Sequence, residues 1–169
     1  MPNSEERRMQ WLRDAHAMEK QAEKMLSALA SRIESYPQLK KKIKSHLGET
    51  KEQAERIESC IERRGGDTSI LKDAGAQLLA MAQGFSGIFA GDEVMKGSLA
   101  SYTFEHMEIA SYRILIAAAK EVGDEKTARV CRKILGEEEA MANWLAENIE
   151  PLTREYMKRD EKDLVGAKR

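Results

Sequence analysis

The segment YTFEHMEIASYRILIAAA, residues 102–119, decides the fold. Successive residues of an α-helix lie about 100° apart, and at this spacing the segment carries an apolar stripe along one side. The stripe consists of Tyr102, Ile109, Tyr112, Ile116 and Ala119. Glu105 falls close to the centre of this stripe, and Glu108 lies on its flank. Because a buried, unpaired carboxylate is costly, the segment predicts a core-facing helix with an unusual acidic group inside the core.

Turn residues divide the rest of the chain into further segments with the same helical periodicity. Pro37 opens one of them, and Gly65, Gly123 and Pro151 stand where others end. We predict long helices at about 4–35, 37–64, 92–122 and 125–148, and a short helix at 152–162. Residues 65–92 connect the second helix to the third, and a shorter helix is predicted within them at 70–81.

These connections indicate the topology. Short loops make antiparallel neighbours, whereas a single long crossover is typical of ferritin-like bundles. The predicted fold class is therefore all-α: a ferritin-like antiparallel four-helix bundle with one long crossover and a short C-terminal helix. We expect one domain over residues 1–169, with the bundle core at about 4–150 and the short helix and tail at 151–169.

The composition supports this fold and excludes several classes of function. The chain is 41% hydrophobic and 34% charged with only 3 Pro, and its formal net charge of −1 argues against nucleic acid as a partner. No apolar run approaches the roughly 20 residues that span a membrane, and residues 1–13 lack the apolar core of a secretory signal. Cys60 and Cys131 stand alone in helical stretches, and no CxxC pair offers a rubredoxin-type iron site. A cytoplasmic protein is the expectation.

Each of the other three long helices carries a candidate acidic group as well. Glu138 falls within about 10° of the centre of the apolar stripe of its helix, whereas Glu19 lies on the edge of its stripe. In the second helix Glu49 lies on the flank of the stripe together with His46, and Glu52 points to the opposite side and is excluded. The stripe containing Glu19 is predicted to include Trp11, Ala15, Met18, Ala22, Met25, Leu26, Leu29 and Ile33.

One glutamate per helix then gives a converging set: Glu19, Glu49, Glu105 and Glu138. Glu19 and Glu49 are 30 residues apart, and Glu105 and Glu138 are 33 apart. In antiparallel hairpins of similar length, these spacings place the members of each pair at similar depth. Four carboxylates in a bundle core, with a histidine or further carboxylates one turn away, are typical of a dinuclear iron or manganese site.

Several residues have a simpler interpretation beside the functional one. His46 is either a metal ligand or a polar residue on the helix flank, and His16 and His106 are expected on the surface. The apolar back face of the third helix is expected to be covered by the crossover or by a second subunit; it consists of Phe104, Met107 and Leu115. The alternative to a metal site is a metal-free structural or interaction bundle, whose buried glutamates are protonated or paired with Arg113 or Arg132.

Three segments also resemble a known family. The stretches FEHMEIASY (104–112), HLGETKEQ (46–53) and MEKQ (18–21) are similar to the bacterial YciE/YciF-type family of ferritin-like proteins, over roughly residues 8–150. The resemblance implies a bundle related to rubrerythrin, usually dimeric, with a di-metal centre and a role in stress response. The family's motif residues fall on Glu19, His46, Glu49, Glu105, Glu108 and Glu138.

The sequence departs from classical ferritin-like sites in its histidines. Met141 stands where a His often follows the helix glutamate, and no His follows Glu49, so the expected metal shell is rich in carboxylate. By analogy with the superfamily, Glu49 and Glu138 are the expected bridging ligands. The implied activity is that of a ferroxidase or a rubrerythrin-like peroxidase reacting with oxygen or peroxide. Because rubrerythrin's Cys-rich module is absent from this sequence, such a peroxidase would need an external electron donor.

Overall fold

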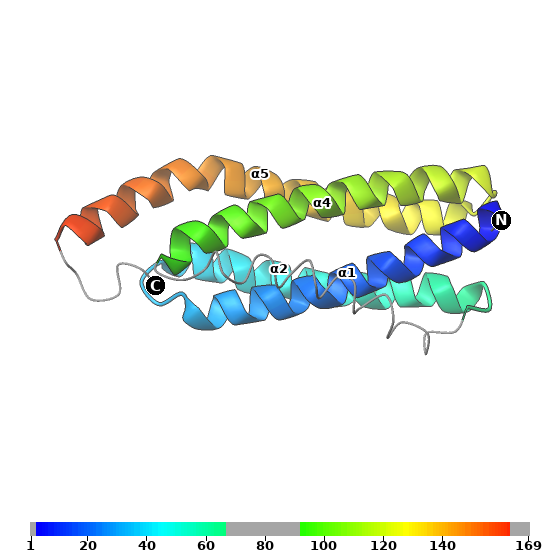
Figure 1. Ribbon diagram of the computed structural model, residues 1–169, viewed down its shortest axis with the longest axis horizontal. Helices are drawn as coiled ribbons and strands as arrows, with labels where there is room; N and C mark the ends of the chain where they lie inside the picture. Colours follow the sequence, from blue (N-terminus) through cyan, green and yellow to red (C-terminus); the bar gives the residue numbers. More distant parts are fainter. Residues whose placement is uncertain (1–2, 67–91, 163–169) are drawn as a thin grey trace.

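The computed structural model describes residues 3–66 and 92–162. Within these ranges the chain forms four long helices and no strand, and Figure 1 shows the helices running along one common axis. The helices are α1 (Ser4–Arg32), α2 (Pro37–Arg63), α4 (Glu93–Glu121) and α5 (Glu125–Glu161). The predicted all-α four-helix bundle is confirmed. The helix predicted at 70–81 lies outside the described residues.

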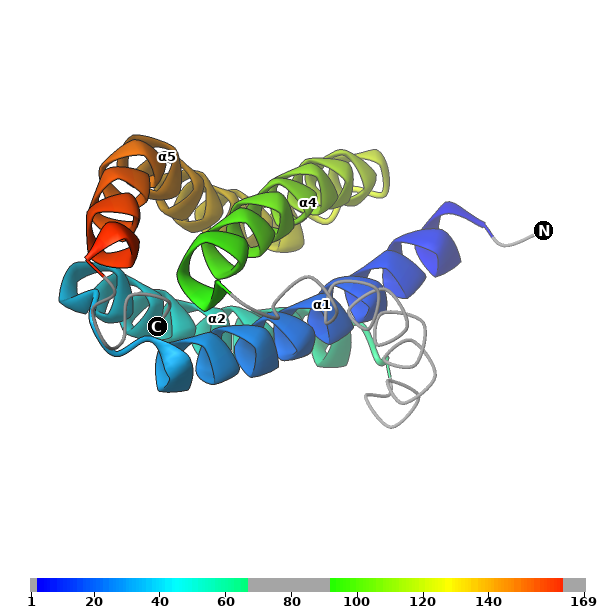
Figure 2. The ribbon, with the colours of Figure 1, turned by 60° about the vertical axis from the view of Figure 1, so that its left-hand side comes forward.

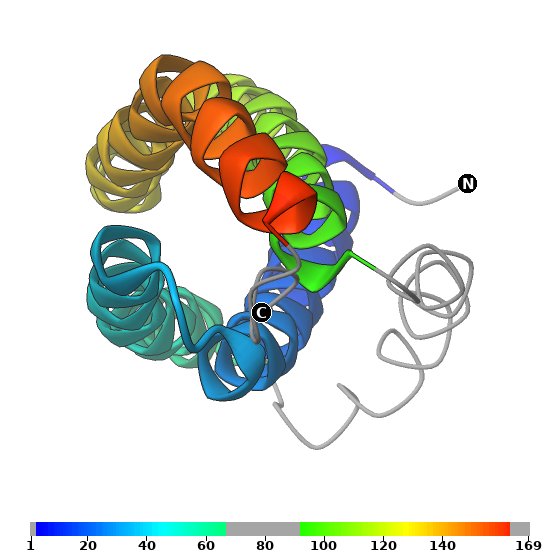
Figure 3. The ribbon, with the colours of Figure 1, turned by 90° about the vertical axis from the view of Figure 1, so that its left-hand side faces the viewer.

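The packing order is visible in the end-on view of Figure 3. α1 packs beside α2 and α4, and α5 packs beside α4 and α2, so the four helices enclose a common interior. None of the described helices is long and apolar enough to cross a membrane.

The turn between α4 and α5 is fixed by one buried acid. Asp124 is the N-cap of α5, where its carboxylate accepts hydrogen bonds from the Thr127 backbone N–H (3.2 Å) and hydroxyl (2.7 Å). It also accepts from the guanidinium groups of Arg8 at 3.3 Å, Arg63 at 3.2 Å and Arg64 at 3.2 Å. Gly123, at φ 70°, supplies the left-handed residue that this turn needs. Asp124 therefore ties α1 and α2 to the start of α5.

Charge at Asp124 is strongly favoured. Burial alone would raise the pKa of its carboxyl group, but the hydrogen bonds from Thr127, Arg64 and Arg63 outweigh burial and hold this pKa well below its usual range. The Arg8 side chain is itself fully buried, so the two charges depend on each other.

The break predicted at Pro151 is wrong, because α5 continues through it for a total length of 37 residues. A proline inside a helix removes one backbone hydrogen bond and usually bends the helix, and the red end of α5 in Figures 1 and 2 turns toward the start of α2. The extension is held by tertiary contacts. Leu152 is buried in the same apolar cluster as Tyr36, and the Arg159 guanidinium lies 5.3 Å from the centroid of the Tyr36 ring.

Apolar side chains form two clusters along the bundle. The first cluster lies toward the α4–α5 turn and includes Leu12, Ile57, Tyr112, Cys131 and Ile134. The second cluster lies toward the α1–α2 turn and includes Leu26, Ile33, Ile43, Met141 and Leu145. Between the clusters lie the buried polar residues His46, Thr50 and Gln53 in α2 and Glu138 in α5, so a polar layer separates the two clusters along these two helices.

Some predicted orientations are corrected by this packing. Phe104 and Leu115, expected on a covered back face of α4, are buried in the first cluster, and Met107 packs against that cluster. Trp11, expected in the core, is 38% exposed. His16, expected on the surface, is only 8% exposed, because α1 is covered by both α2 and α4 and its buried arc is therefore wider than its apolar stripe.

Candidate metal centre

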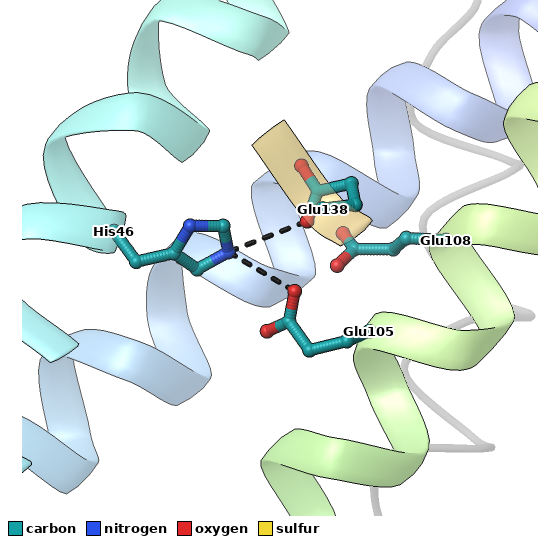
Figure 4. Close-up of side chains that lie close together, drawn as sticks. All are labelled: His46, Glu105, Glu108 and Glu138. Carbon is teal, nitrogen blue, oxygen red and sulfur yellow. Dashed lines mark ion pairs between the residues drawn. The ribbon is translucent and has the colours of Figure 1, made fainter. Parts of the chain in front are cut away.

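Four potential ligands meet in the polar layer between the clusters. His46 comes from α2, Glu105 and Glu108 from α4, and Glu138 from α5, and Figure 4 shows their side chains pointing toward one another. One ligand atom from each lies within 4.8 Å of all the others, and each residue is at most 1% exposed. Glu105 and Glu108 are three residues apart, so they project from the same face of α4.

The His46 ring joins three helices. Its Nε2 atom lies 3.2 Å from Glu105 Oε2 and 3.3 Å from Glu138 Oε2 (Figure 4). The backbone beneath it is held by Thr50, whose hydroxyl donates to the His46 carbonyl oxygen at 3.0 Å. The structure thus brings together four of the six residues singled out in the sequence.

Glu49 is not brought into this group. Its carboxylate lies on the other side of the His46 ring, with Oε2 2.9 Å from Nδ1, and its side chain is 42% exposed. Glu19 lies inside the core at 0% exposure, where its Oε1 atom accepts a hydrogen bond from the Tyr112 hydroxyl. Tyr112, predicted from periodicity as a core aromatic, is thereby the partner of a buried acid.

Burial makes ionisation of these acids costly. Burial and the nearby Glu138 charge raise the pKa of Glu19 to about 8, and burial raises the pKa of Glu105 to about 8 even though His46 lowers it. The pKa of Glu108 is well above its usual value for the same reason, with the charges of Glu19 and Glu138 adding to it.

Burial acts on the His46 imidazole in the opposite direction from its effect on the acids, because the charged form of histidine is the protonated one. Burial alone would lower the pKa of His46, but contact with Glu105 and Glu138 outweighs burial and raises this pKa to about 11. Positive charge is therefore favoured at this point of the core.

The residues present fit a cation. Buried oxygens without a hydrogen-bond partner among the described residues are Glu19 Oε2, Glu105 Oε2, Glu108 Oε1 and both oxygens of Glu138. A buried acceptor left unpaired costs about 1–3 kcal/mol. Because several such oxygens face one another here, a single cation bound among them would stabilise them all. Carboxylate and imidazole donors suit manganese and iron, whereas thiolate-seeking metals find no ligand in this group.

Arginine does not fill that role in the described part of the chain. Arg113 pairs with Glu139 at 2.8 Å and Arg132 with Glu125 at 3.4 Å, both near the surface. The alternative in which these two arginines neutralise the buried glutamates is therefore contradicted. Arg56 instead pairs with Glu137 at 2.5 Å across α2 and α5, and Gln53 donates to the same carboxylate at 3.0 Å.

A sequence profile of the family described as "Domain of unknown function (DUF892)" matches residues 3–158. The chain belongs to the DUF892 family. Protein YciF of Escherichia coli K12 is 34% identical over 137 residues, which cover 76% of this chain and 80% of YciF. The resemblance to the YciE/YciF-type family is confirmed.

Solved structures related to this DUF892 chain have the same fold. A protein from Xanthomonas campestris pv. campestris is 40% identical, with a TM-score of 0.79 over 94% of this chain and 99% of its own. YcfI from Rhodopseudomonas palustris is 28% identical, with a TM-score of 0.71 over 86% and 94%. The E. coli stress protein YciF, aligned by structure, is 28% identical, with a TM-score of 0.72 over 88% and 96%.

Proposed function

We propose that this DUF892 protein is a ferritin-like metal-binding protein whose buried cluster holds a dinuclear iron or manganese centre. The observation that carries the proposal is the set of unpartnered carboxylate oxygens around the His46 ring in the core. Glu19 completes the set from α1, so that every helix of the bundle contributes a residue.

The ligand pattern is a variant of the usual ferritin-like one. In related di-iron bundles two helices each give one Glu and two give Glu-x-x-His. Here Glu19 and Glu138 are the single glutamates of α1 and α5, α4 gives Glu105-x-x-Glu108, and α2 gives His46. Four carboxylates and one imidazole offer enough donor atoms for two ions with shared carboxylates.

The reaction we propose is oxidation chemistry with oxygen or peroxide, of the ferroxidase or rubrerythrin-like peroxidase type, the latter with an external electron donor. Bound iron or manganese supplies the redox change. The chain's own residues hold the carboxylates in place, exclude water through the two apolar clusters, and orient Glu19 through the Tyr112 hydroxyl. The relative YciF is described as a stress protein, which supports a role in stress response for this chain.

Metal content tests the proposal directly. Protein purified without chelators or affinity tags is expected to contain iron or manganese at about two ions per chain by elemental analysis, as in dinuclear sites of this fold. Added Fe(II) is expected to be oxidised faster in its presence than in buffer alone. If the purified protein contains no metal and binds neither added iron nor added manganese, the result would support the alternative of a metal-free structural bundle.

Tyr112→Phe tests the support of Glu19. The change leaves Glu19 Oε1 buried without its hydrogen-bond donor, so the metal-free protein is expected to lose about 1–3 kcal/mol of unfolding free energy in urea denaturation. Tyr102→Phe on the same helix, where the side chain is partly exposed, is the control. Equal losses in both variants would show that the Tyr112 hydroxyl gives no specific support.

We further propose a homodimer formed through α4. Leu99 is 58% exposed and Ile114 51% exposed. They share one face of the helix with the exposed residues Thr103, His106, Ala110, Arg113 and Ala117, of which Arg113 carries a charge and pairs with Glu139. Light scattering at micromolar concentration is expected to give twice the chain mass, and Ile114→Glu is expected to give the monomer, because a charge would have to be desolvated in the interface. A monomeric wild type would contradict this proposal.

A further inference from the structure

The two nitrogens of His46 face different surroundings. Nε2 points into the cluster, 3.2 Å from Glu105 and 3.3 Å from Glu138, while Nδ1 lies 2.9 Å from the Glu49 carboxylate. In Figure 4 the ring presents one nitrogen to the glutamates of α4 and α5 and turns the other away. The ring is thus held from both sides.

The contrast in exposure separates the roles of the two sides. The His46 side chain is 1% exposed and its Nε2 partners at most 1%, whereas the Glu49 side chain is 42% exposed. A carboxylate is a strong acceptor for an N–H donor. Glu49 and His46 are three residues apart on α2, so the helix itself keeps them in contact.

An imidazole that ligates a metal through one nitrogen generally donates its other N–H to a carboxylate or carbonyl, which fixes the tautomer and the ring orientation. We propose that Glu49 is such a positioning residue: it accepts the Nδ1–H of His46, so that the Nε2 lone pair faces the metal, and it does not itself bind the metal. This inference rests on the proposed metal-binding function and departs from the bridging role expected for Glu49 by superfamily analogy.

The two roles make different demands on the side chain. As an acceptor, Glu49 can be replaced by glutamine, whose amide oxygen still accepts from Nδ1–H but which is a poor metal ligand. As a bridging ligand, Glu49 cannot be replaced by glutamine, because a bridge between two metal ions requires both carboxylate oxygens and their negative charge. Glu49→Gln therefore separates positioning from ligation, and Glu49→Ala removes both.

The test uses Mn(II) titration of the full chain by calorimetry, with Glu52→Gln as control because Glu52 is an exposed glutamate on the same helix. Glu49→Gln is expected to keep the wild-type stoichiometry and an affinity within a few-fold of wild type. Glu49→Ala is expected to bind about 10–100-fold more weakly with the same stoichiometry, as for other partners of metal-ligating histidines. The nitrogen modulation in the electron spin echo of the Mn(II)-loaded protein is expected to persist in Glu49→Gln and to weaken in Glu49→Ala.

Other outcomes identify what has failed. A Glu49→Gln variant that binds as weakly as Glu49→Ala, or that takes up fewer ions per chain than wild type, would overturn the inference and make Glu49 a ligand. A wild-type protein that takes up no Mn(II) would overturn the proposed function itself, and the inference with it. Circular dichroism of each variant checks that the helical fold is retained.

Discussion

Replacing Asp124 by asparagine is expected to lower the free energy of unfolding by about 3–5 kcal/mol, the usual cost of removing one partner of a buried charge pair. Asparagine can still cap α5 through the Thr127 backbone N–H, but it no longer neutralises the fully buried Arg8 or attracts Arg63 and Arg64. Urea denaturation followed by circular dichroism measures the loss. For a chain of this size it corresponds to a fall in melting temperature of about 10 °C.

Glu125→Gln is the matched control, since it removes the neighbouring charge. Glu125 is 64% exposed and contacts Arg132 at 3.4 Å, an interaction worth no more than about 1 kcal/mol. If Asp124→Asn were no more damaging than Glu125→Gln, the buried charge cluster would not stabilise the turn.

Asp124 also predicts a dependence on pH. Its pKa is lowered in the folded protein relative to the unfolded value of about 3.9. Its contribution to stability is therefore fully present above the unfolded pKa and is lost as the pH falls through the folded pKa. The wild type is expected to lose stability more steeply below about pH 4 than Asp124→Asn, because the variant has no carboxylate to protonate at this position.

The second large effect is expected at Glu138. Because metal binds the folded state preferentially, Fe(II) or Mn(II) is expected to raise the melting temperature of the wild type as the metal concentration increases. At a free metal concentration of a hundred times Kd, the free energy of unfolding is expected to increase by about 2.7 kcal/mol. Glu138→Ala removes the carboxylate that contacts His46 from α5 and is expected to abolish most of this response. Without metal, the variant is expected to be as stable as wild type or more so, because the repulsion of Glu138 with Glu19 and Glu108 is removed while His46 keeps its contact with Glu105.

Glu139→Ala is the control for this experiment, because Glu139 follows Glu138 on α5 but pairs with Arg113 near the surface. It is expected to respond to metal as wild type does. Identical melting of wild type and Glu138→Ala, with and without metal, would remove the support for a metal centre at this position.

The helices and the central acids could be predicted from sequence because periodicity reports the direction of each Cβ. Glu105 and Glu138 lie near the centres of their stripes, and both are buried. Glu49 lies on a flank, where the side-chain torsions decide between the cluster and the outer side of His46. Those torsions depend on neighbours from other helices, which a single-helix pattern does not contain.

Two other features depended on contacts between distant parts of the chain. Pro151 indicated a helix end, but the tertiary contacts of Leu152 and Arg159 outweigh the lost backbone hydrogen bond. In the sequence, Asp124 is distinguished only by its place after Gly123. Its arginine partners lie 116, 61 and 60 residues away, so nothing local marked it as a buried charge.

The polar layer between the two apolar clusters has a consequence for the cooperativity of folding. Each cluster can bury its own side chains. The clusters adjoin along α1 and α4, whereas along α2 and α5 they are joined by the continuity of the helices and by the contacts of His46 with Glu105 and Glu138. Without a cation, these acids contribute little to coupling, and the two ends of the bundle can open as separate units in native-state hydrogen exchange. A metal bound by all four helices would link both ends at their shared boundary, so that the bundle opens as one unit.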